Sequence, residues 1–282
     1  LRDRLLPENF RVMAIGRTEY DDDGFRGWLR ERIGDGESRN GGPLDDLLGR
    51  IHYHPLNLND IDGMAATLSR YADRPAVSYL STPPNLFESA CLGLKAAGLL
   101  EPPSRLVLEK PIGHDLPSAR EIDATLKSAL DESRIFRIDH YLGKAPVQNL
   151  LALRFGNTLL EAVWDNRCIE SVDILVAETA GVDGREGYYA DYGALRDMVQ
   201  NHMLQLLALV AMEPPAALDA DSIRDEKRKV LRALRPMTAA TPPIFPTSTS
   251  GLPGANSSRS PALSRSPRPA SSRISSASAR PW

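Results

Sequence analysis

Short apolar runs alternate with helix-like periodicity along the first half of the chain. Strands are predicted where large apolar residues cluster between Gly, Pro or polar residues, at 10–15, 76–80, 105–108 and 135–138. Helices are predicted where apolar residues recur every three or four positions, at 86–97 and 118–130. This alternation is typical of α/β architecture, and we expect half of a doubly wound, Rossmann-like parallel sheet.

The pattern changes after residue 140. A helix is predicted over 145–154, and residues 169–177 alternate like a strand with one solvated face, which favours an antiparallel sheet. A long helix over 191–212 is expected to stop before the Pro-Pro pair that follows it. We therefore expect a partial α/β domain at 1–140 and the start of an α+β domain at 141–236.

The C-terminal segment 237–282 has a different composition. It contains no Asp, Glu or Lys and is rich in Ser, Pro, Thr and Ala, and its five arginines are its only formal charges. The whole chain has net charge −3, so the preceding part carries −8. A segment with so few large apolar residues cannot offset its ordering entropy, and disorder is predicted. Binding of RNA or a membrane and a shifted reading frame are the less favoured interpretations.

Charge and cysteine content exclude several classes of protein. A net charge of −3 in 282 residues gives no strong field for nucleic acid or an anionic membrane, and no apolar run approaches the ~20 residues of a spanning helix. Two cysteines, Cys91 and Cys168, exclude a disulfide-rich scaffold and indicate a reducing compartment, the cytoplasm. The chain begins at Leu1 inside a pattern and without a signal-peptide layout, so we expect a piece of a longer protein.

Several predicted strands end in residues suited to chemistry, and ligands of open α/β sheets bind beyond the carboxyl ends of strands. Arg17 follows the first strand, where an Arg can pair with the 2′-phosphate of NADP, although a lone Arg there is more often a solvated charge. Lys110 precedes Pro111 at another strand end, where a cis bond can direct the Lys into a cleft; a plain turn is the alternative.

The segment 139–144 is denser in functional groups. His140, Tyr141 and Lys144 offer hydrogen-bond donors and a cation beside a helix start, which suits a phosphate dianion. Side chains alternate along a strand, so Asp139 is expected to face away from His140.

His202 lies on the predicted long helix, with Asp197 five positions before it. A His on an otherwise apolar helix is most often a hydrogen-bonded core residue. A carboxylate at Asp139 makes a general base the competing interpretation.

Other candidates are weaker. His52 and His54 have the spacing of two metal ligands on a strand face without an evident third, so a strand-edge pair is favoured. The acidic runs 21–23 and 219–225 are interpreted as solvated loops. The sequence has no Gly-x-Ser-x-Gly, P-loop or His-Glu-x-x-His motif.

Three blocks together resemble the glucose-6-phosphate dehydrogenase family: EKPIG at 109–113, RIDHYLGK at 137–144 and GALRDMVQNHMLQ at 193–205. Shorter matches lie at 7–10, 81–84 and 166–167, and the resemblance covers about residues 1–236. It implies oxidation of glucose 6-phosphate at C1 to the lactone, the first step of the oxidative pentose phosphate pathway, with hydride transfer to NADP.

The resemblance also implies roles for individual residues. His202 would take the C1 hydroxyl proton and Asp139 would orient it. The substrate-binding residues would be His140, Tyr141, Lys144, Glu178, Asp197 and Lys110. The cofactor-binding residues would be Arg17, Lys110 and Pro111. No metal is implied.

Two departures from the family pattern bear on activity. The Gly-x-x-Gly-Asp-Leu-Ala turn that holds the pyrophosphate is missing from the sequence, and the segment 237–282 stands where the large antiparallel sheet would continue. Family members are homo-oligomeric, but most of the interface sheet would be lacking here. Little or no turnover by this chain is therefore expected.

Two alternatives remain. A dehydrogenase of the glucose–fructose oxidoreductase kind shares the Glu-Lys-Pro, but the phosphate-binding block 137–144 argues against it. A non-catalytic remnant that binds at most a sugar phosphate or a partner chain is the alternative from another class.

Overall fold

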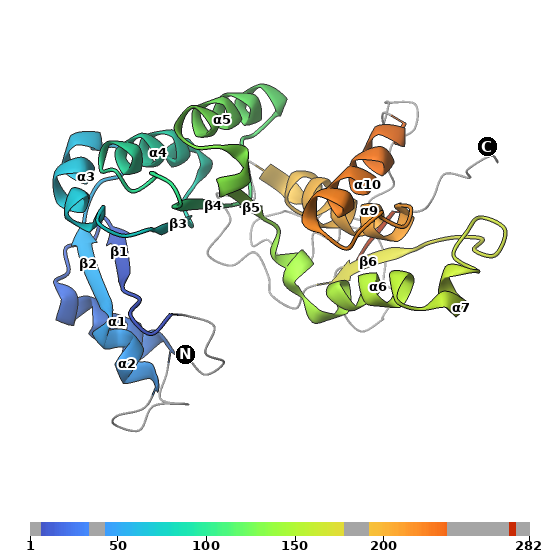
Figure 1. Ribbon diagram of the computed structural model, residues 1–282, viewed down its shortest axis with the longest axis horizontal. Coiled ribbons are helices and arrows are strands. Elements are labelled where there is room, and N and C mark those ends of the chain that lie inside the picture. Colours follow the sequence, from blue (N-terminus) through green and yellow to red (C-terminus); the bar gives the residue numbers. More distant parts are fainter. Residues whose placement is uncertain (1–6, 34–42, 178–191, 236–270, 275–282) are drawn as a thin grey trace, which may run out of the picture. The chain divides into compact units, whose positions relative to one another are not determined.

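The computed structural model describes residues 7–33, 43–177, 192–235 and 271–274. The chain divides into two compact units, Leu1–Ile138 and Asp139–Trp282 (Figure 1). Each unit has its own buried apolar cluster, and the two are described separately.

The first unit is built on parallel strands. They are β1 (Val12–Gly16), β2 (Ile51–Pro55), β3 (Val77–Leu80), β4 (Arg105–Glu109) and β5 (Ile135–Ile138). Within the described residues, β1 pairs with β2, and β3, β4 and β5 form a second sheet in that order. The parallel α/β class is confirmed, but the expected continuous half sheet is divided, because no described hydrogen bonds join β1 to β3.

Helices cover these strands in Figure 1, where α3, α4 and α5 lie together beside the β3–β4–β5 sheet. The helical elements are α1 (Asp22–Ile33), α2 (Pro43–Gly49), α3 (Ile61–Leu68), η2 (Ser69–Tyr71), η3 (Pro84–Leu86), α4 (Phe87–Ala96), α5 (Leu116–Ala129) and η4 (Glu132–Arg134). The two helices predicted from periodicity are α4 and α5. Helix α5 begins earlier than expected because the Asp115 side chain caps it by accepting the Ser118 N–H at 2.9 Å.

The expectation of a solvated loop at 21–23 was wrong for its last two residues. Asp22 and Asp23 occupy the first turn of α1, where carboxylates complement the helix dipole. Asp21 accepts the Gly24 N–H at 2.7 Å and so holds the start of this helix. The sequence pattern missed α1 because the helix begins in an acidic run that resembles a loop.

The core of the first unit lies between α3, α4, α5 and β4. Met64, Leu68, Phe87, Leu106 and Leu126 are fully buried there. Helices α3 and α4 approach closely at Gly93, where a Cβ would lie 2.6 Å from the Met64 sulfur. Burial of these side chains, rather than helix propensity, stabilises this packing. The packing in turn positions the residues that follow the carboxyl ends of the strands.

The second unit is mostly helical among its described residues. Its elements are η5 (His140–Gly143), α6 (Ala145–Phe155), α7 (Thr158–Glu161), β6 (Ile174–Ala177), η6 (Leu195–Met203), α9 (Leu204–Ala211), α10 (Ala220–Ala233) and β7 (Ser271–Ile274). The strand expected over 169–177 forms only at 174–177, and residues 169–173 have no regular structure. Ile169 instead donates to the Asp165 carbonyl and closes a turn. The loop expected at 219–225 is helical from Ala220, with Asp219 as its N-cap.

The long helix predicted over 191–212 is present in two forms. Segment η6 is π-helical and continues directly into α9, which ends at Ala211. The buried guanidinium of Arg154 donates to the carbonyls of Leu209 and Met212 at 2.6 and 2.8 Å, so it satisfies carbonyls at the end of α9. This contact ties α6 to the helix that carries His202.

Strand β7 pairs antiparallel with β6. It lies within the segment 237–282, for which disorder was expected, and the remainder of that segment is outside the described residues. Disorder of the tail and a larger antiparallel sheet stay predictions. Among the described residues, none of the helices combines the length and apolarity needed to cross a bilayer.

Candidate functional site

The centre of the candidate site is a contact between an imidazole and a carboxylate. Nδ1 of His202 lies 2.5 Å from Oδ1 of Asp139, although 63 positions separate them in sequence. The His202 side chain is fully buried, and that of Asp139 is 12 % exposed. A short contact in a water-poor setting fixes the orientation of the ring, and the carboxylate favours the tautomer protonated at Nδ1.

Asp139 is itself held by the backbone. It caps η5, and its Oδ1 accepts the Tyr141 N–H at 3.0 Å. Rotation of the Asp139 carboxylate away from His202 would break its hydrogen bond with the Tyr141 N–H, which caps the 3₁₀ turn. The sequence interpretation expected Asp139 to face a different way from His140, on the assumption of a continuing strand. The strand has ended at Ile138, so that alternation argument does not apply.

The other ring nitrogen of His202, Nε2, differs from Nδ1 in its hydrogen bonding. Nε2 is buried and has no hydrogen-bond partner within the described part of the chain. With Nδ1 donating to Asp139, Nε2 carries the lone pair and is the atom able to accept a proton. Among the described residues, His202 is therefore hydrogen-bonded at Nδ1 and not at Nε2.

Two aromatic residues pack against His202. The Tyr141 ring stacks on the imidazole, with ring centroids 4.1 Å apart and an interplanar angle of 23°. His140 meets His202 edge-on at 4.7 Å. Tyr141 is 5 % exposed, whereas His140 is exposed. The buried tyrosine thus supports the base from one face, and His140 lies at the solvent side of the cluster.

Lys144 completes this group. Its Nζ lies 3.5 Å from the centroid of the Tyr141 ring, on which a cation is attracted by the ring quadrupole. Lys144 also precedes α6, whose N-terminus adds positive potential. An exposed ammonium, an exposed imidazole and a helix start within one short segment provide donors for a dianion.

Asp197 and Lys227 lie in the same unit. Asp197 is on η6 and is 7 % exposed. Burial lowers the pKa of Lys227 on α10, and attraction by Asp139 opposes that lowering. Nothing in the sequence indicates this electrostatic effect, because Lys227 lies in an ordinary charged helix pattern.

The residues predicted to meet the cofactor lie in the first unit. Arg17 is exposed directly after β1, and Lys110 follows β4, so both stand at carboxyl ends of parallel strands. The Lys110–Pro111 peptide bond is cis. Tyr53 donates its hydroxyl to the Thr18 carbonyl at 2.7 Å, which restrains the backbone beside Arg17. Glu178, the remaining predicted substrate ligand, lies outside the described residues.

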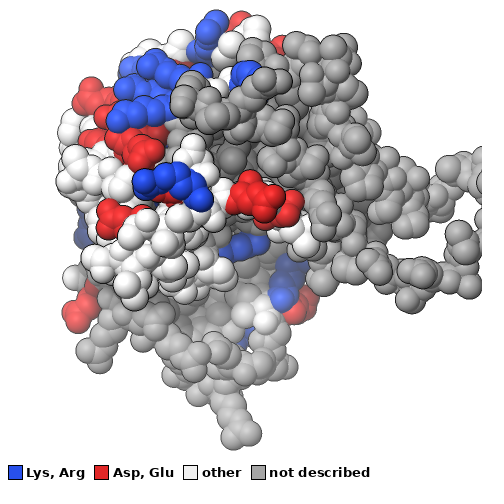
Figure 2. Space-filling view, turned by 90° about the vertical axis from the view of Figure 1, so that its right-hand side faces the viewer, with Lys and Arg blue, Asp and Glu red and all other residues white. Residues whose placement is uncertain are grey.

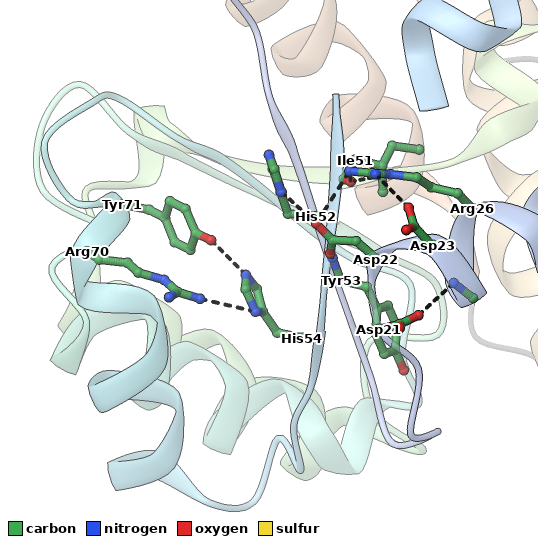
Figure 3. Close-up of polar contacts among 11 residues, drawn as sticks. Asp21, Asp22, Asp23, Arg26, Ile51, His52, Tyr53, His54, Arg70 and Tyr71 are labelled. Atoms are coloured by element: carbon green, nitrogen blue, oxygen red, sulfur yellow. Dashed lines mark hydrogen bonds and ion pairs between the residues drawn. The ribbon is translucent and has the colours of Figure 1, made fainter. Parts of the chain in front are cut away.

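Both histidines of β2 have partners in the protein (Figure 3). His52 Nδ1 lies 2.9 Å from Asp22, and His54 Nε2 lies 2.9 Å from the Tyr71 hydroxyl. Burial and the Arg70 charge lower the pKa of His54. These contacts agree with the interpretation of a pair of structural histidines.

One group of side chains has the spacing of a metal site. The ligand atoms of Asp139, His140 and His202 lie within 4.8 Å of one another. The nitrogen of His202 that faces Asp139 is engaged in the short hydrogen bond, and a cation there would displace its proton. The arrangement therefore suits proton transfer at least as well as metal binding.

The surface charges of the second unit are mixed in sign. On the face drawn in Figure 2, basic and acidic side chains are interspersed. On α10, for example, Lys229 and Arg228 pair with Glu226 and Asp225. No field of one sign is seen on that described surface, so recognition is expected from the local groups around His202.

Comparisons with known proteins agree with this arrangement. The family model for the NAD binding domain of glucose-6-phosphate dehydrogenase matches residues 1–149, and the model for its C-terminal domain matches 151–243. A glucose-6-phosphate 1-dehydrogenase from Zymomonas mobilis is 46% identical over 258 residues, covering 90% of this chain and 53% of the relative. One from Bacillus subtilis is 40% identical over 240 residues, covering 82% and 48%.

Solved structures give the same relationship. A glucose-6-phosphate 1-dehydrogenase from Mycobacterium avium has a TM-score of 0.71 at 39% identity, covering 82% of this chain and 51% of that one. A glucose-6-phosphate dehydrogenase in complex with its substrate has a TM-score of 0.70 at 34% identity, covering 84% and 51%. The chain spans about half the length of the curated relatives it matches. With two family models matching in succession, the chain belongs to the glucose-6-phosphate dehydrogenase family.

Proposed function

We propose that this chain carries the machinery for oxidising glucose 6-phosphate at C1, with hydride transfer to NADP. The observation that carries the proposal is the His202–Asp139 pair, whose outer nitrogen Nε2 is buried and unpartnered among the described residues. Oxidation of an alcohol by hydride transfer needs a group that removes the hydroxyl proton. Nε2 is suited to that step.

The proton transfer follows from this geometry. Nε2 of His202 accepts the C1 hydroxyl proton while C1 loses its hydride, which forms the lactone and leaves an imidazolium. Asp139 then faces a positive ring at 2.5 Å and stabilises it. Tyr141, stacked on the same ring, keeps the imidazole plane in place. General-base assistance of this kind contributes typically ~10²–10⁴-fold in rate.

Substrate recognition is proposed for the exposed groups beside this pair. Lys144, His140 and the start of α6 would bind the phosphate. Tyr141 would support this contact, because the Lys144 ammonium lies over its ring. Contacts to a remote phosphate supply binding energy that positions C1. Asp197, Glu178 and Lys110 are proposed to bind sugar hydroxyls.

The cofactor side is proposed for the first unit. Its parallel strands present an exposed guanidinium at Arg17 and an amine at Lys110 beyond their carboxyl ends. This donor set fits a 2′-phosphorylated dinucleotide, because Arg pairs bidentately with phosphate. NADP, when bound, would accept the hydride from C1. Residues 1–140 would then be the partial dinucleotide-binding domain and 141–236 part of the substrate and subunit-contact domain.

The polypeptide of residues 1–282, tested by itself, contains no Gly-x-x-Gly-Asp-Leu-Ala turn to hold a pyrophosphate, so slow turnover is proposed for this polypeptide. The second candidate function is a non-catalytic protein that binds glucose 6-phosphate, which the donors at Lys144 and His140 support. A cytoplasmic location is proposed from its two free thiols, Cys91 and Cys168.

Two measurements on the purified chain test the proposal. Isothermal titration with glucose 6-phosphate is expected to show binding, and glucose without phosphate is expected to bind far more weakly. Incubation with glucose 6-phosphate and NADP is expected to form NADPH, far more slowly than the Bacillus subtilis relative does. Binding without NADPH would establish the second candidate instead, and equal affinity for the two sugars would overturn both.

A further inference from the structure

An open surface pocket of about 510 Å³, called the cavity below, lies at the amino-terminal ends of β1 and β2 in the first unit. The side chains that matter to its chemistry are those of Asn9, Phe10, Arg11, Arg50, His52 and Arg74. Three of these residues are arginines, and among the described residues no Asp or Glu belongs to the lining. The volume falls within the range of small-molecule sites, about 300–1,000 Å³.

Arg50 and His52 are held in place by other residues of the protein. Nε and Nη2 of Arg50 each lie 3.1 Å from one carboxylate oxygen of Asp46, Nη1 donates to the Glu8 carbonyl, and the guanidinium lies over the Phe10 ring. His52 is anchored at Nδ1 by Asp22 (Figure 3). These groups are oriented before any ligand arrives, which lowers the entropy cost of binding.

The other two arginines are weakly engaged. Arg74 has one ion pair, to its neighbour Asp73, at 3.8 Å, and its side chain is 61% exposed. Arg11 is exposed and makes no hydrogen bond or ion pair within the described part of the chain. Because Arg11 and Arg74 line the same cavity as Arg50 and His52, their weakly engaged guanidiniums are available to a ligand with several negative charges. Each guanidinium can bind a phosphate with two parallel hydrogen bonds.

The cavity is separate from the proposed cofactor residues. Arg11 precedes β1 and Arg50 precedes β2, whereas Arg17 and Lys110 follow the carboxyl ends of β1 and β4. Parallel strands place their amino and carboxyl ends at opposite edges of a sheet. A ligand in the cavity therefore occupies a different edge from a dinucleotide.

We propose that this cavity binds a small molecule carrying at least two phosphate groups. The three arginines and His52 provide donors for two neighbouring phosphates, and Asn9 adds a neutral polar group. A pyrophosphate unit, free or within a nucleoside diphosphate, shares this chemistry. The site is independent of the glucose 6-phosphate site in the second unit.

Isothermal titration of the full chain with pyrophosphate, ADP and sulfate tests the proposal. Pyrophosphate or ADP is expected to bind with one site per chain and sulfate far more weakly. Arg11→Ala and Arg74→Ala are each expected to weaken binding by about tenfold, the size expected from losing a charge-assisted hydrogen bond. Arg120→Ala is the matched control, since Arg120 is exposed on α5 and makes no described contact.

The outcome can also contradict the proposal. Sulfate binding as tightly as pyrophosphate would show a general anion site, and unchanged affinity in Arg11→Ala and Arg74→Ala would place the ligand elsewhere. Displacement by NADP together with loss of binding in Arg17→Ala would assign the pyrophosphate to the cofactor edge. Circular dichroism of each variant verifies that it is folded, and glucose 6-phosphate affinity is expected to stay the same throughout.

Discussion

The imidazole of His202 and the carboxylate of Asp139 meet at 2.5 Å between a π-helical segment and a 3₁₀ turn. The 3₁₀ turn is a common connector, whereas a π-helical segment is rare in ordinary folds. Segments of π-helix are frequent at functional sites, where they re-aim a side chain that regular helix geometry would direct elsewhere. Here the segment presents His202 to the cap residue of the facing turn.

The first prediction concerns this pair. Replacing His202 by Ala is expected to reduce NADPH formation by about 10²–10⁴-fold, to background, because it removes the proposed base. Asp139→Asn is expected to lower it as well, since Asn does not stabilise the imidazolium. Glucose 6-phosphate affinity, measured by titration, should change little in His202→Ala. A variant at position 202 that keeps its turnover would contradict the role of the imidazole.

The second prediction concerns phosphate recognition. Lys144→Met retains the length of the side chain but removes its charge, and it is expected to weaken glucose 6-phosphate binding by about tenfold. Weak binding of unphosphorylated glucose should not change. Lys229→Met is the matched control, because Lys229 pairs only with Glu226 on the surface of α10 among its described contacts. Equal losses in both variants would indicate a general charge effect and not a contact.

The third prediction concerns the turn that follows Lys110. Gly113 has φ +80°, and a Cβ there would lie 2.6 Å from the backbone nitrogen of Ala119. Gly113→Ala is therefore expected to lower the free energy of unfolding by about 1–3 kcal/mol. Gly27→Ala within α1 is the control, since a Cβ there meets nothing within 4 Å.

The control is expected to change stability in the opposite direction. Replacing a Gly in a helix interior by Ala stabilises by about 0.5–1 kcal/mol. Urea unfolding followed by circular dichroism measures both variants. If Gly113→Ala were as stable as the unchanged chain, the left-handed conformation and the close approach to Ala119 would not be present in solution.

The fourth prediction concerns pH. Burial acts to raise the pKa of Asp22, but hydrogen bonds from Tyr53 and His52 and the charge of Arg26 outweigh it, so the pKa lies below its ordinary 3.8. A carboxyl group with a lowered folded-state pKa stabilises the fold above the unfolded pKa and loses that contribution as pH falls toward the folded value.

The stability difference between the unchanged chain and Asp22→Asn is therefore expected to narrow as the pH falls from about 5 through 3.8 and below. Urea unfolding at a series of pH values measures it. A difference that stayed constant over this range would show that the carboxylate is not held by its partners.

The family and the parallel α/β class could be predicted from local sequence. Strand β5 formed over the predicted residues, because an apolar run this short between polar segments is typical of a strand and too short for a helix. Helices α4 and α5 were found from apolar periodicity. In contrast, α1 and α10 were missed because both begin in acidic runs that resemble loops, and both depend on side-chain caps that only a folded backbone can use.

The candidate site shows the same division. The motif 137–144 and the helix carrying His202 led to the proposed chemistry without any structure. Local pattern could not show that Tyr141 stacks on His202, that the charge of Asp139 acts on the pKa of Lys227, or that three arginines line one cavity. Each of these arises from elements that are distant along the chain.

By itself, the sequence determined which residue types are available and which short segments form regular structure, because propensity, capping and periodicity act over a few neighbouring residues. Tertiary structure alone decided which of those residues meet, since a hydrogen bond such as that between His202 and Asp139 requires packing of segments 63 positions apart. That packing is driven by non-directional burial of apolar surface, which local pattern does not encode.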